Sequence, residues 1–182
     1  GLGVGRSVDE AMVWFARASD EGHAPAQLAL AMIYLDPASG RGDYDRGAGW
    51  LRRAAEQGLP EAQFNMGLLS AGAFGNPPQL PIAAEWFAKA ANQGHIGAQY
   101  NLGVFYLEGR GVEKDVIKAA SLIGKAAQAG HVDARLDYGV LVMRGEGVQQ
   151  DEKIGAQWLL VSARRGNAIA QNRLARLYAF GK

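Results

Sequence analysis

Apolar residues recur along the chain at the spacing of amphipathic helices. Residues 98–107 carry one stripe, with apolar side chains at positions i, i+4, i+7 and i+8. The stripe consists of Ala98, Leu102, Phe105 and Tyr106. A second helix is predicted at about residues 114–129, with Gly109 and Gly111 before it and Gly130 at its end. Its inward-facing residues are Ala119, Leu122, Ile123, Ala126 and Ala127. Two helices joined by a short loop predict an antiparallel helix hairpin.

The same pattern returns every 36 residues through the chain. Four residue types mark the period, each at a fixed slot of the unit. They are Gly22, Gly58, Gly94, Gly130 and Gly166; Trp14, Trp50, Trp86 and Trp158; Ala26, Ala62, Ala98, Ala134 and Ala170; and Gln27, Gln63, Gln99 and Gln171. A fixed period of this length predicts a solenoid, in which each unit buries its apolar face against its neighbours.

Small residues occupy two further slots and predict close helix packing. The slot in the first helix holds Ala31, Gly67, Gly103, Gly139 and Ala175, and the slot in the second holds Ala18, Ala54, Ala90, Ala126 and Ser162. Glycine inside a helix costs about 0.5–1 kcal/mol relative to alanine, so its recurrence indicates a neighbouring backbone too close for a side chain. We expect the tryptophan slot to do the reverse and to fill space.

The chain contains no threonine and no clear two-residue alternation, so strands are not predicted. We therefore expect an all-α fold: a right-handed superhelical solenoid of antiparallel helix hairpins with about ten helices. The array is predicted to occupy residues 1–182 as a single domain. Its units are 1–22 (second helix only), 23–58, 59–94, 95–130, 131–166 and 167–182 (first helix only). Gly1-Leu2-Gly3-Val4 matches Gly145-Glu146-Gly147-Val148, and Gly181 matches Gly145. This phase predicts that the chain is a fragment of a longer array.

Composition fits a folded protein, with 48% apolar and 20% charged residues among 182. The net charge of +1 and the lack of a basic cluster argue against a nucleic acid as partner. There are no cysteines, so neither disulfides nor thiol chemistry are available. No apolar run reaches the length of a membrane span, so direct membrane insertion is not expected. No signal peptide is visible, although the chain starts in mid-motif.

Residues 97–130 carry their small and polar residues in a specific order. The positions that matter are Gly97, Ala98, Gln99, Asn101, Leu102, Gly103, Tyr106, Gly109, Gly111, Val112, Asp115, Ala119, Ala126, Ala127 and Gly130. This order resembles the Sel1-like repeat, a relative of the tetratricopeptide repeat, and the resemblance recurs over the whole chain. Leu122 replaces the tryptophan, Arg135 replaces the glutamine, and residues 37–40 and 73–76 replace the G-x-G-V loop. We expect these departures to alter loop shape without changing the 36-residue spacing.

Candidate chemical groups at repeated slots are better explained by structure. His23, His95 and His131 follow the hairpin-ending glycine, and neighbouring helices lie about 8–10 Å apart, too far for shared zinc ligands. We interpret these histidines as turn or helix-start residues. The aspartates at the start of the second helix read as N-caps. They are Asp43, Asp115 and Asp151. The glycine-rich segments read as inter-helix turns, because no strand precedes them. No catalytic, cofactor-binding or metal site is predicted.

The resemblance to tetratricopeptide-like arrays implies that the first helices line a concave, partner-binding face. The family's ligand-facing positions map onto three rows of this sequence. The rows are Leu28, Phe64, Tyr100, Leu136 and Asn172; Met32, Leu68, Val104, Val140 and Arg176; and Asn65, Asn101, Asp137 and Arg173. The first two rows are largely apolar although the core stripe lies elsewhere, as expected of an interaction patch. Burial between adjacent hairpins is the competing explanation for the second row. For the asparagines, a structural role competes with peptide binding.

Three hypotheses for function follow. The first is a non-enzymatic scaffold that binds a partner protein or peptide on the concave face. The second is a module that binds or hydrolyses a cell-wall-like ligand, and the third is a structural spacer between flanking domains. The resemblance implies a bacterial protein in envelope assembly, signalling or host contact. It favours a periplasmic or secreted location, with a cytoplasmic one as the alternative.

Overall fold

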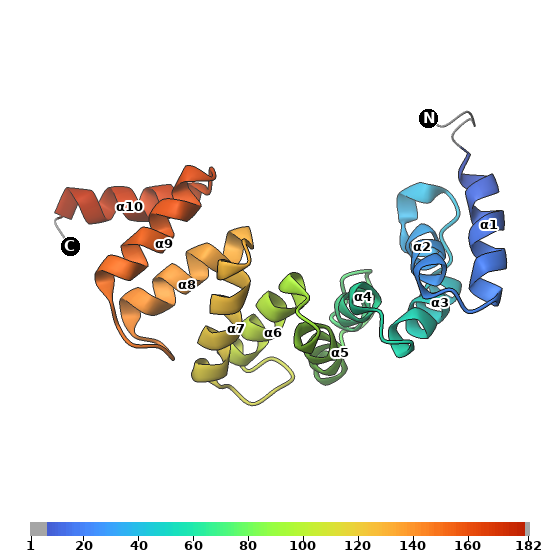
Figure 1. Ribbon diagram of the computed structural model, residues 1–182, viewed down its shortest axis with the longest axis horizontal. Helices are drawn as coiled ribbons and strands as arrows, with labels where there is room; N and C mark the ends of the chain where they lie inside the picture. The colour runs from blue at the N-terminus through green and yellow to red at the C-terminus, as the bar shows by residue number, and fades with distance from the viewer. Residues whose placement is uncertain (1–6, 181–182) are drawn as a thin grey trace. The chain divides into compact units, whose positions relative to one another are not determined.

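The structure is a computed structural model that describes residues 7–180, and every regular element in that range is helical (Figure 1). The chain divides into two compact units, Gly1–Gln79 and Leu80–Lys182. The first unit contains α1 (Val8–Asp20), α2 (Ala24–Leu35), the 3-10 helix η1 (Pro37–Ser39), α3 (Tyr44–Glu56) and α4 (Pro60–Ser70). The second contains α5 (Leu80–Asn92), α6 (Ile96–Glu108), α7 (Val116–Gln128), α8 (Val132–Arg144), α9 (Glu152–Arg164) and α10 (Ala168–Phe180).

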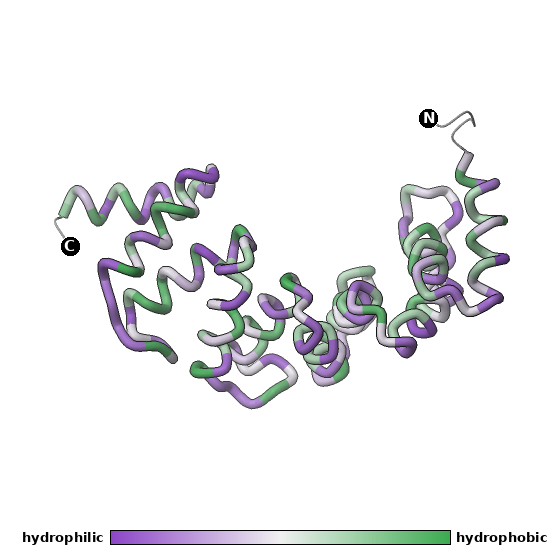
Figure 2. Tube along the Cα trace, viewed as in Figure 1, coloured by the Kyte–Doolittle hydropathy of each residue, from purple (hydrophilic) through white to green (hydrophobic). Residues whose placement is uncertain are grey.

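These ten α-helices, with no strand between residues 7 and 180, confirm the prediction of an all-α fold built from helix hairpins. Within each unit, every helix packs against its neighbours in sequence, and each helix carries both hydrophobic and hydrophilic positions (Figure 2). The single array over residues 1–182 stays a prediction. The prediction of a longer array depends on Gly1-Leu2-Gly3-Val4 and Gly181, and these residues lie outside the described range.

The predicted caps begin the helices. Asp43, Asp115 and Asp151 each accept a hydrogen bond from the backbone amide three residues later, at 3.0, 2.9 and 2.8 Å respectively. These bonds satisfy amides that the first turn leaves without an intrahelical partner. The capping interpretation of the three aspartates is confirmed.

The three histidines begin α2, α6 and α8. Each histidine Nδ1 accepts a hydrogen bond from the backbone amide three residues later. The bonds join His23 to Ala26, His95 to Ala98 and His131 to Ala134, at 3.2, 3.1 and 3.3 Å. The interpretation of these residues as helix-start residues is confirmed.

Small residues set the closest contacts inside the hairpins. A Cβ built on Gly103 of α6 would lie 2.6 Å from Ile123 Cγ1 and 3.3 Å from the carbonyl oxygen of Ala119 on α7. On α8, a Cβ at Gly139 would lie 3.1 Å from the carbonyl oxygen of Gly155 on α9. The prediction of backbone-to-backbone approach is therefore confirmed. A facing slot that the sequence analysis missed takes part in these contacts, and it holds Gly47, Ala119 and Gly155.

The repeated glutamine fastens each first helix to the second helix before it. Its side-chain amide donates to the carbonyl oxygen eight residues earlier, which lies in the last turns of the preceding helix. The bonds join Gln27 to Ser19, Gln63 to Ala55, Gln99 to Ala91, and Gln171 to Ala163 at 3.0–3.4 Å. Arg135, which replaces the glutamine, keeps the bond with its Nε at 3.4 Å from the Ala127 oxygen.

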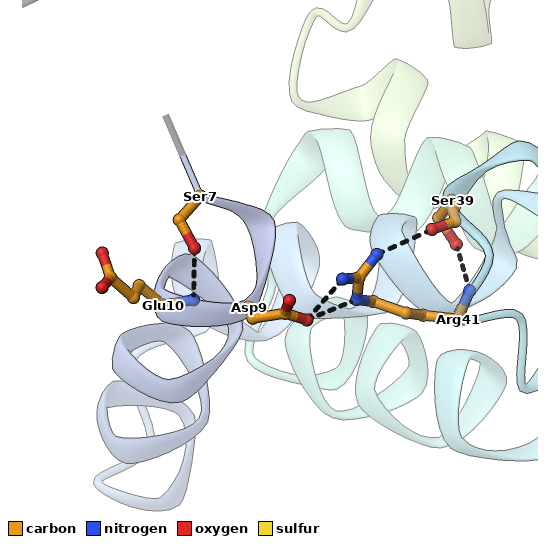
Figure 3. A network of polar contacts seen from close by, with 5 residues as sticks. All are labelled: Ser7, Asp9, Glu10, Ser39 and Arg41. Atoms are coloured by element: carbon orange, nitrogen blue, oxygen red, sulfur yellow. Dashed lines mark hydrogen bonds and ion pairs between the residues drawn. The ribbon is translucent and has the colours of Figure 1, made fainter. Parts of the chain in front are cut away.

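A second fastening lies at the other end of the same helix pairs. Gly147, in the loop after α8, has a φ of 71°, and a Cβ on it would overlap the carbonyl group of Val116 at the start of α7. Gly111 approaches Leu80 at the start of α5 in the same way. The loop that replaces G-x-G-V after α2 makes its contact with side chains instead (Figure 3). There Arg41 Nε donates to Asp9 Oδ1 of α1 at 2.7 Å, and Arg41 Nη1 donates to the carbonyl oxygen of Ser39 at 2.9 Å.

The tryptophan slot is only partly the space-filling position that was predicted. Trp50, Trp86 and Trp158 are half-buried, and Trp14 is 65% exposed. In three of the four units, a cation three residues later lies over the tryptophan ring: Arg17 over Trp14, Arg53 over Trp50 and Lys89 over Trp86. The Lys89 ammonium, for example, lies 3.8 Å from the centroid of the Trp86 ring.

Replacing Gly103 tests the close helix contact. We expect Gly103→Leu to lower the free energy of unfolding by about 1–3 kcal/mol or more, because overpacking forces backbone shifts. Gly49→Ala on α3 is the control, since a Cβ at Gly49 would meet nothing within 4 Å. That variant should gain about 0.5–1 kcal/mol. Urea denaturation of both variants measures the difference, and an unchanged midpoint for Gly103→Leu would contradict the packing argument.

Replacing Gly147 tests the loop fastening separately from backbone strain. Gly147 and Gly166 both have positive φ, 71° and 88°, but a Cβ on Gly166 would meet nothing within 4 Å. Both alanine variants should therefore lose about 1–2 kcal/mol to the left-handed conformation. Gly147→Ala should lose a further 1–3 kcal/mol, approximately, from the clash with Val116. Equal losses in the two variants would show that the loop contact contributes nothing.

Candidate partner-binding groove

The first helices of the second unit line a groove. Two adjoining cavities, of about 380 Å³ and 850 Å³, lie along α6, α8 and α10. Both are lined by Val140, Arg144, Ile169 and Arg173, so they form one continuous surface feature. We refer to the two together as the α6–α8–α10 groove.

The floor of the groove is apolar and continuous with the core. Leu136 and Leu159 belong to a buried cluster, with Val140, Met143 and Leu177 partly buried against it. Leu136 is only 8% exposed, in a cluster that also contains Ala163 and Ala170. Higher in the groove the lining opens, and Ile169 is 59% exposed. The groove therefore offers apolar surface that the core does not use.

A polar network crosses the α6 side of the groove. The Tyr100 hydroxyl donates to Asp137 Oδ2 at 2.9 Å, and its ring stacks on His131 with the centroids 4.4 Å apart and the planes 26° apart. The network ties α6 to the first turns of α8, where His131 is also the N-cap. Tyr100 thus has a structural role beside any contact with a ligand.

Burial shapes the acidity of both partners. It raises the pKa of the Asp137 carboxyl above its ordinary value and outweighs the opposing effect of the Tyr100 hydrogen bond. The neighbouring Asp133 also raises this pKa, whereas Arg173 and His131 lower it. Burial, followed by the Asp137 charge, raises the pKa of the Tyr100 hydroxyl. The pair therefore favours a protonated tyrosine that donates to the carboxylate.

The charges at the α10 end of the groove are positive and largely uncompensated. Arg173 and Arg176 are exposed, and neither makes an ion pair within 4 Å with any residue of the range 7–180. Arg144 lies 3.5 Å from Glu146, and Glu108 lies 3.6 Å from Arg110. The carboxylates that line the groove thus each have a partner, whereas the two arginines of α10 do not.

The structure brings together part of the predicted ligand-facing set. The predicted residues that line the groove are Tyr100, Val104, Leu136, Asp137, Val140, Asn172, Arg173 and Arg176. Leu28, Met32, Phe64, Asn65 and Leu68 lie on α2 and α4 of the first unit and line neither cavity. Of these five, Met32 is the most open at 37% exposed, and Asn65 is buried at 8%.

The two asparagines serve their own helices. Asn65 Nδ2 donates to the carbonyl oxygen of Glu61, and Asn101 Nδ2 donates to that of Gly97, both at 2.8 Å. This i to i−4 bond uses one of the two N–H donors of each side-chain amide. Both asparagines therefore have the structural role that was the alternative to peptide binding.

Several groove residues were missed by the sequence analysis. They are Met143, Arg144, Ile169 and Leu177. The slot of Arg144 holds Asp36, Gly72 and Glu108 in other units, so it carries no periodic signal. A search for residues that recur every 36 positions finds the scaffold and passes over positions that vary.

Between residues 7 and 180, no helix has both the length and the hydropathy needed to cross a bilayer. In the same range, no three His, Cys, Asp or Glu side chains gather where they could hold one metal ion.

The raised pKa of Asp137 predicts a pH dependence of stability. The folded protein holds this proton to a higher pH than the unfolded chain, so ionisation costs stability as the pH rises past the ordinary aspartate value. Asp137→Asn removes that cost and keeps an oxygen for Tyr100. The melting temperature of the variant, relative to the parent, should rise between about pH 3 and pH 7. Glu85→Gln, at an exposed position of α5, is the control and should show a smaller change. A relative fall for Asp137→Asn would mean that the carboxylate stabilises the fold.

Comparison with known proteins identifies the repeat. The Sel1 repeat matches residues 1–23, 24–59, 60–95, 96–131, 132–167 and 168–182. No curated protein matches the chain. Proteins of the Sel1 repeat family generally act as protein–protein interaction scaffolds and are typically non-catalytic.

Solved structures agree in both fold and sequence. The protective antigen c5321 of uropathogenic Escherichia coli, which displays an SLR fold, aligns with a TM-score of 0.87 and 36% identity over 93% of this chain. The chain spans only 36% of that protein's length. A Sel1 repeat protein from Oxalobacter formigenes aligns with a TM-score of 0.85 and 33% identity, covering 99% of this chain and 74% of that one. The repeated sequence, the helix hairpins and these alignments agree, and the chain belongs to the Sel1 repeat family.

Proposed function

We propose that this chain is a non-enzymatic scaffold that binds a partner protein or peptide through its first helices. In the second unit, the α6–α8–α10 groove is the contact surface. The observation that carries the proposal is the groove itself, a continuous apolar surface with exposed residues at its rim. Apolar area left open in this way is typical of interaction sites.

The groove suits a polypeptide better than a small molecule. Ligand pockets for small molecules bury most of the ligand surface. Here Arg173, Arg176 and Ile169 remain exposed in the lining, so a small molecule would keep much of its surface in water. A chain that runs across several helices gains contacts at each of them.

The enzyme alternative has one cluster to consider, the Tyr100–Asp137–His131 network. Each member is already engaged: the tyrosine donates to the aspartate, and the Nδ1 atom of His131 accepts the amide of Ala134. A structural task accounts for the whole arrangement. The spacer alternative predicts instead that substitutions in the groove change no interaction, which the following experiment tests.

Truncating side chains in the groove should weaken partner binding. Tyr100→Ala and Val104→Ala should both weaken binding of the partner recovered by affinity capture. For Tyr100→Ala the loss of binding free energy should be about 2 kcal/mol, as is common for aromatic interface anchors. Val104→Ala is included because it leaves the Tyr100–Asp137 bond intact. Phe64→Ala asks whether the binding face also includes α4. Glu56→Gln on α3 is the control and should stay within about 0.5 kcal/mol of the parent.

Titration calorimetry measures the affinities, and circular dichroism verifies that each variant is folded. If both groove variants bind like the parent, the scaffold proposal loses its binding face and the spacer becomes the better explanation. If Glu56→Gln alone weakens binding, the partner contacts the second helices.

A further inference from the structure

The α10 end of the groove combines three guanidinium groups with apolar surface. Arg173 and Arg176 are three residues apart on α10, and Arg144 ends α8. All three line the 850 Å³ cavity, together with Val140, Ile169 and other apolar side chains. Residues three apart on a helix face the same side, so both arginines of α10 point along one edge of the cavity.

The electrostatics at this end favour a negatively charged ligand. The carboxylates of the groove are engaged: Glu146 with Arg144, Glu108 with Arg110, and Asp137 with the Tyr100 hydroxyl. Arg173 acts on Asp137 over a longer distance, but neither Arg173 nor Arg176 makes an ion pair within 4 Å in the described range. A guanidinium group binds a carboxylate through two parallel hydrogen bonds and remains charged at all physiological pH values.

The spacing of the arginines matches an extended peptide. Side chains at i and i+3 of a helix have Cβ atoms about 5–6 Å apart. Residues i and i+2 of an extended chain point to the same side and lie about 6.8 Å apart. Two acidic residues separated by one position can therefore reach both arginines. Residues i+4 and i+6 of the same peptide face the protein as well, where the apolar lining begins.

We propose, on the basis of the scaffold function above, that the α10 end of the groove binds an extended acidic segment of the partner protein. Acidic side chains at i and i+2 contact Arg173 and Arg176, and apolar side chains at i+4 and i+6 lie on Val140, Ile169 and Leu177. The arginines select the acidic pattern, while the apolar floor contributes contact area without that selectivity.

A defined peptide tests this pattern. The probe is a fluorescein-labelled peptide with the sequence Glu-Ser-Glu-Ser-Leu-Ser-Leu, and its matched partner carries Gln at both Glu positions. Fluorescence anisotropy gives the affinity of the full chain for each. We expect the Glu peptide to bind at least about tenfold more tightly than the Gln peptide, because its contacts are charge-assisted. The preference should shrink as salt is added, since exposed charges are screened.

Protein variants locate the effect. Arg173→Ala combined with Arg176→Ala should reduce the preference for the Glu peptide to less than about threefold, while weak binding of the Gln peptide persists. Lys153→Ala combined with Arg164→Ala is the matched control. It removes the same charge from exposed positions of α9 that do not line the groove, and it should keep the preference.

Several outcomes would overturn the proposal. They are equal affinity for the Glu and Gln peptides, no binding of either, or loss of the preference in the α9 control. A single-stranded oligonucleotide of equal charge that binds as tightly as the Glu peptide would overturn it too, because the arginines would then select charge alone. If the two peptides bind equally and Val104→Ala weakens the binding of both, the acidic pattern is rejected, but the scaffold function is not. Partner binding that no groove variant alters would reject the scaffold function itself.

Discussion

The close approach of two helix backbones within each hairpin is the constraint on which the rest of the structure depends. At Gly103 and Gly139 there is no room for a side chain, since Ile123 on α7 and the Gly155 carbonyl on α9 lie within 3.1 Å of where a Cβ would be. The line along which the two helices of these hairpins touch therefore carries glycine at the closest points. Larger apolar residues lie at other slots. Some are buried in the core, such as Ile123 and Leu159, and others line the groove, such as Val140 and Ile169.

Much of the scaffold could be predicted from the sequence because the scaffold repeats. The recurrence of Asp43, Asp115 and Asp151 predicted where the second helices begin. It also predicted that the carboxylates cap the first turn. The role of the glutamine slot could not be predicted, although its recurrence was plain. Its bond reaches a carbonyl group eight residues back in another helix, and only the angle between the two helices brings the groups together. Arg135 shows that the slot requires a donor of sufficient length and not glutamine as such.

The candidate site could be predicted only in outline. The resemblance to related arrays pointed to the first helices, and Tyr100, Val104 and Arg176 do line the groove. Arg144 and Ile169 could not be found in the same way, because their slots hold different residues in each unit. Repetition records what every unit needs in order to fold, whereas a binding surface is made by the positions at which units differ. Asn65 and Asn101 illustrate the converse, since their recurrence reflects a bond within each helix.

The two fastenings between neighbouring helices have a mechanical consequence for the second unit. α6 is joined to α5 at one end by Gln99 and at the other by the loop around Gly111, and α8 is joined to α7 by Arg135 and Gly147. A single attachment would act as a hinge about which a helix could swing. Attachment at both ends leaves no such axis, so α6 and α8 move with the helices behind them. Each of these two first helices is thus ordered against the second helix before it, and a partner of the kind proposed would not bear the entropic cost of ordering that pair.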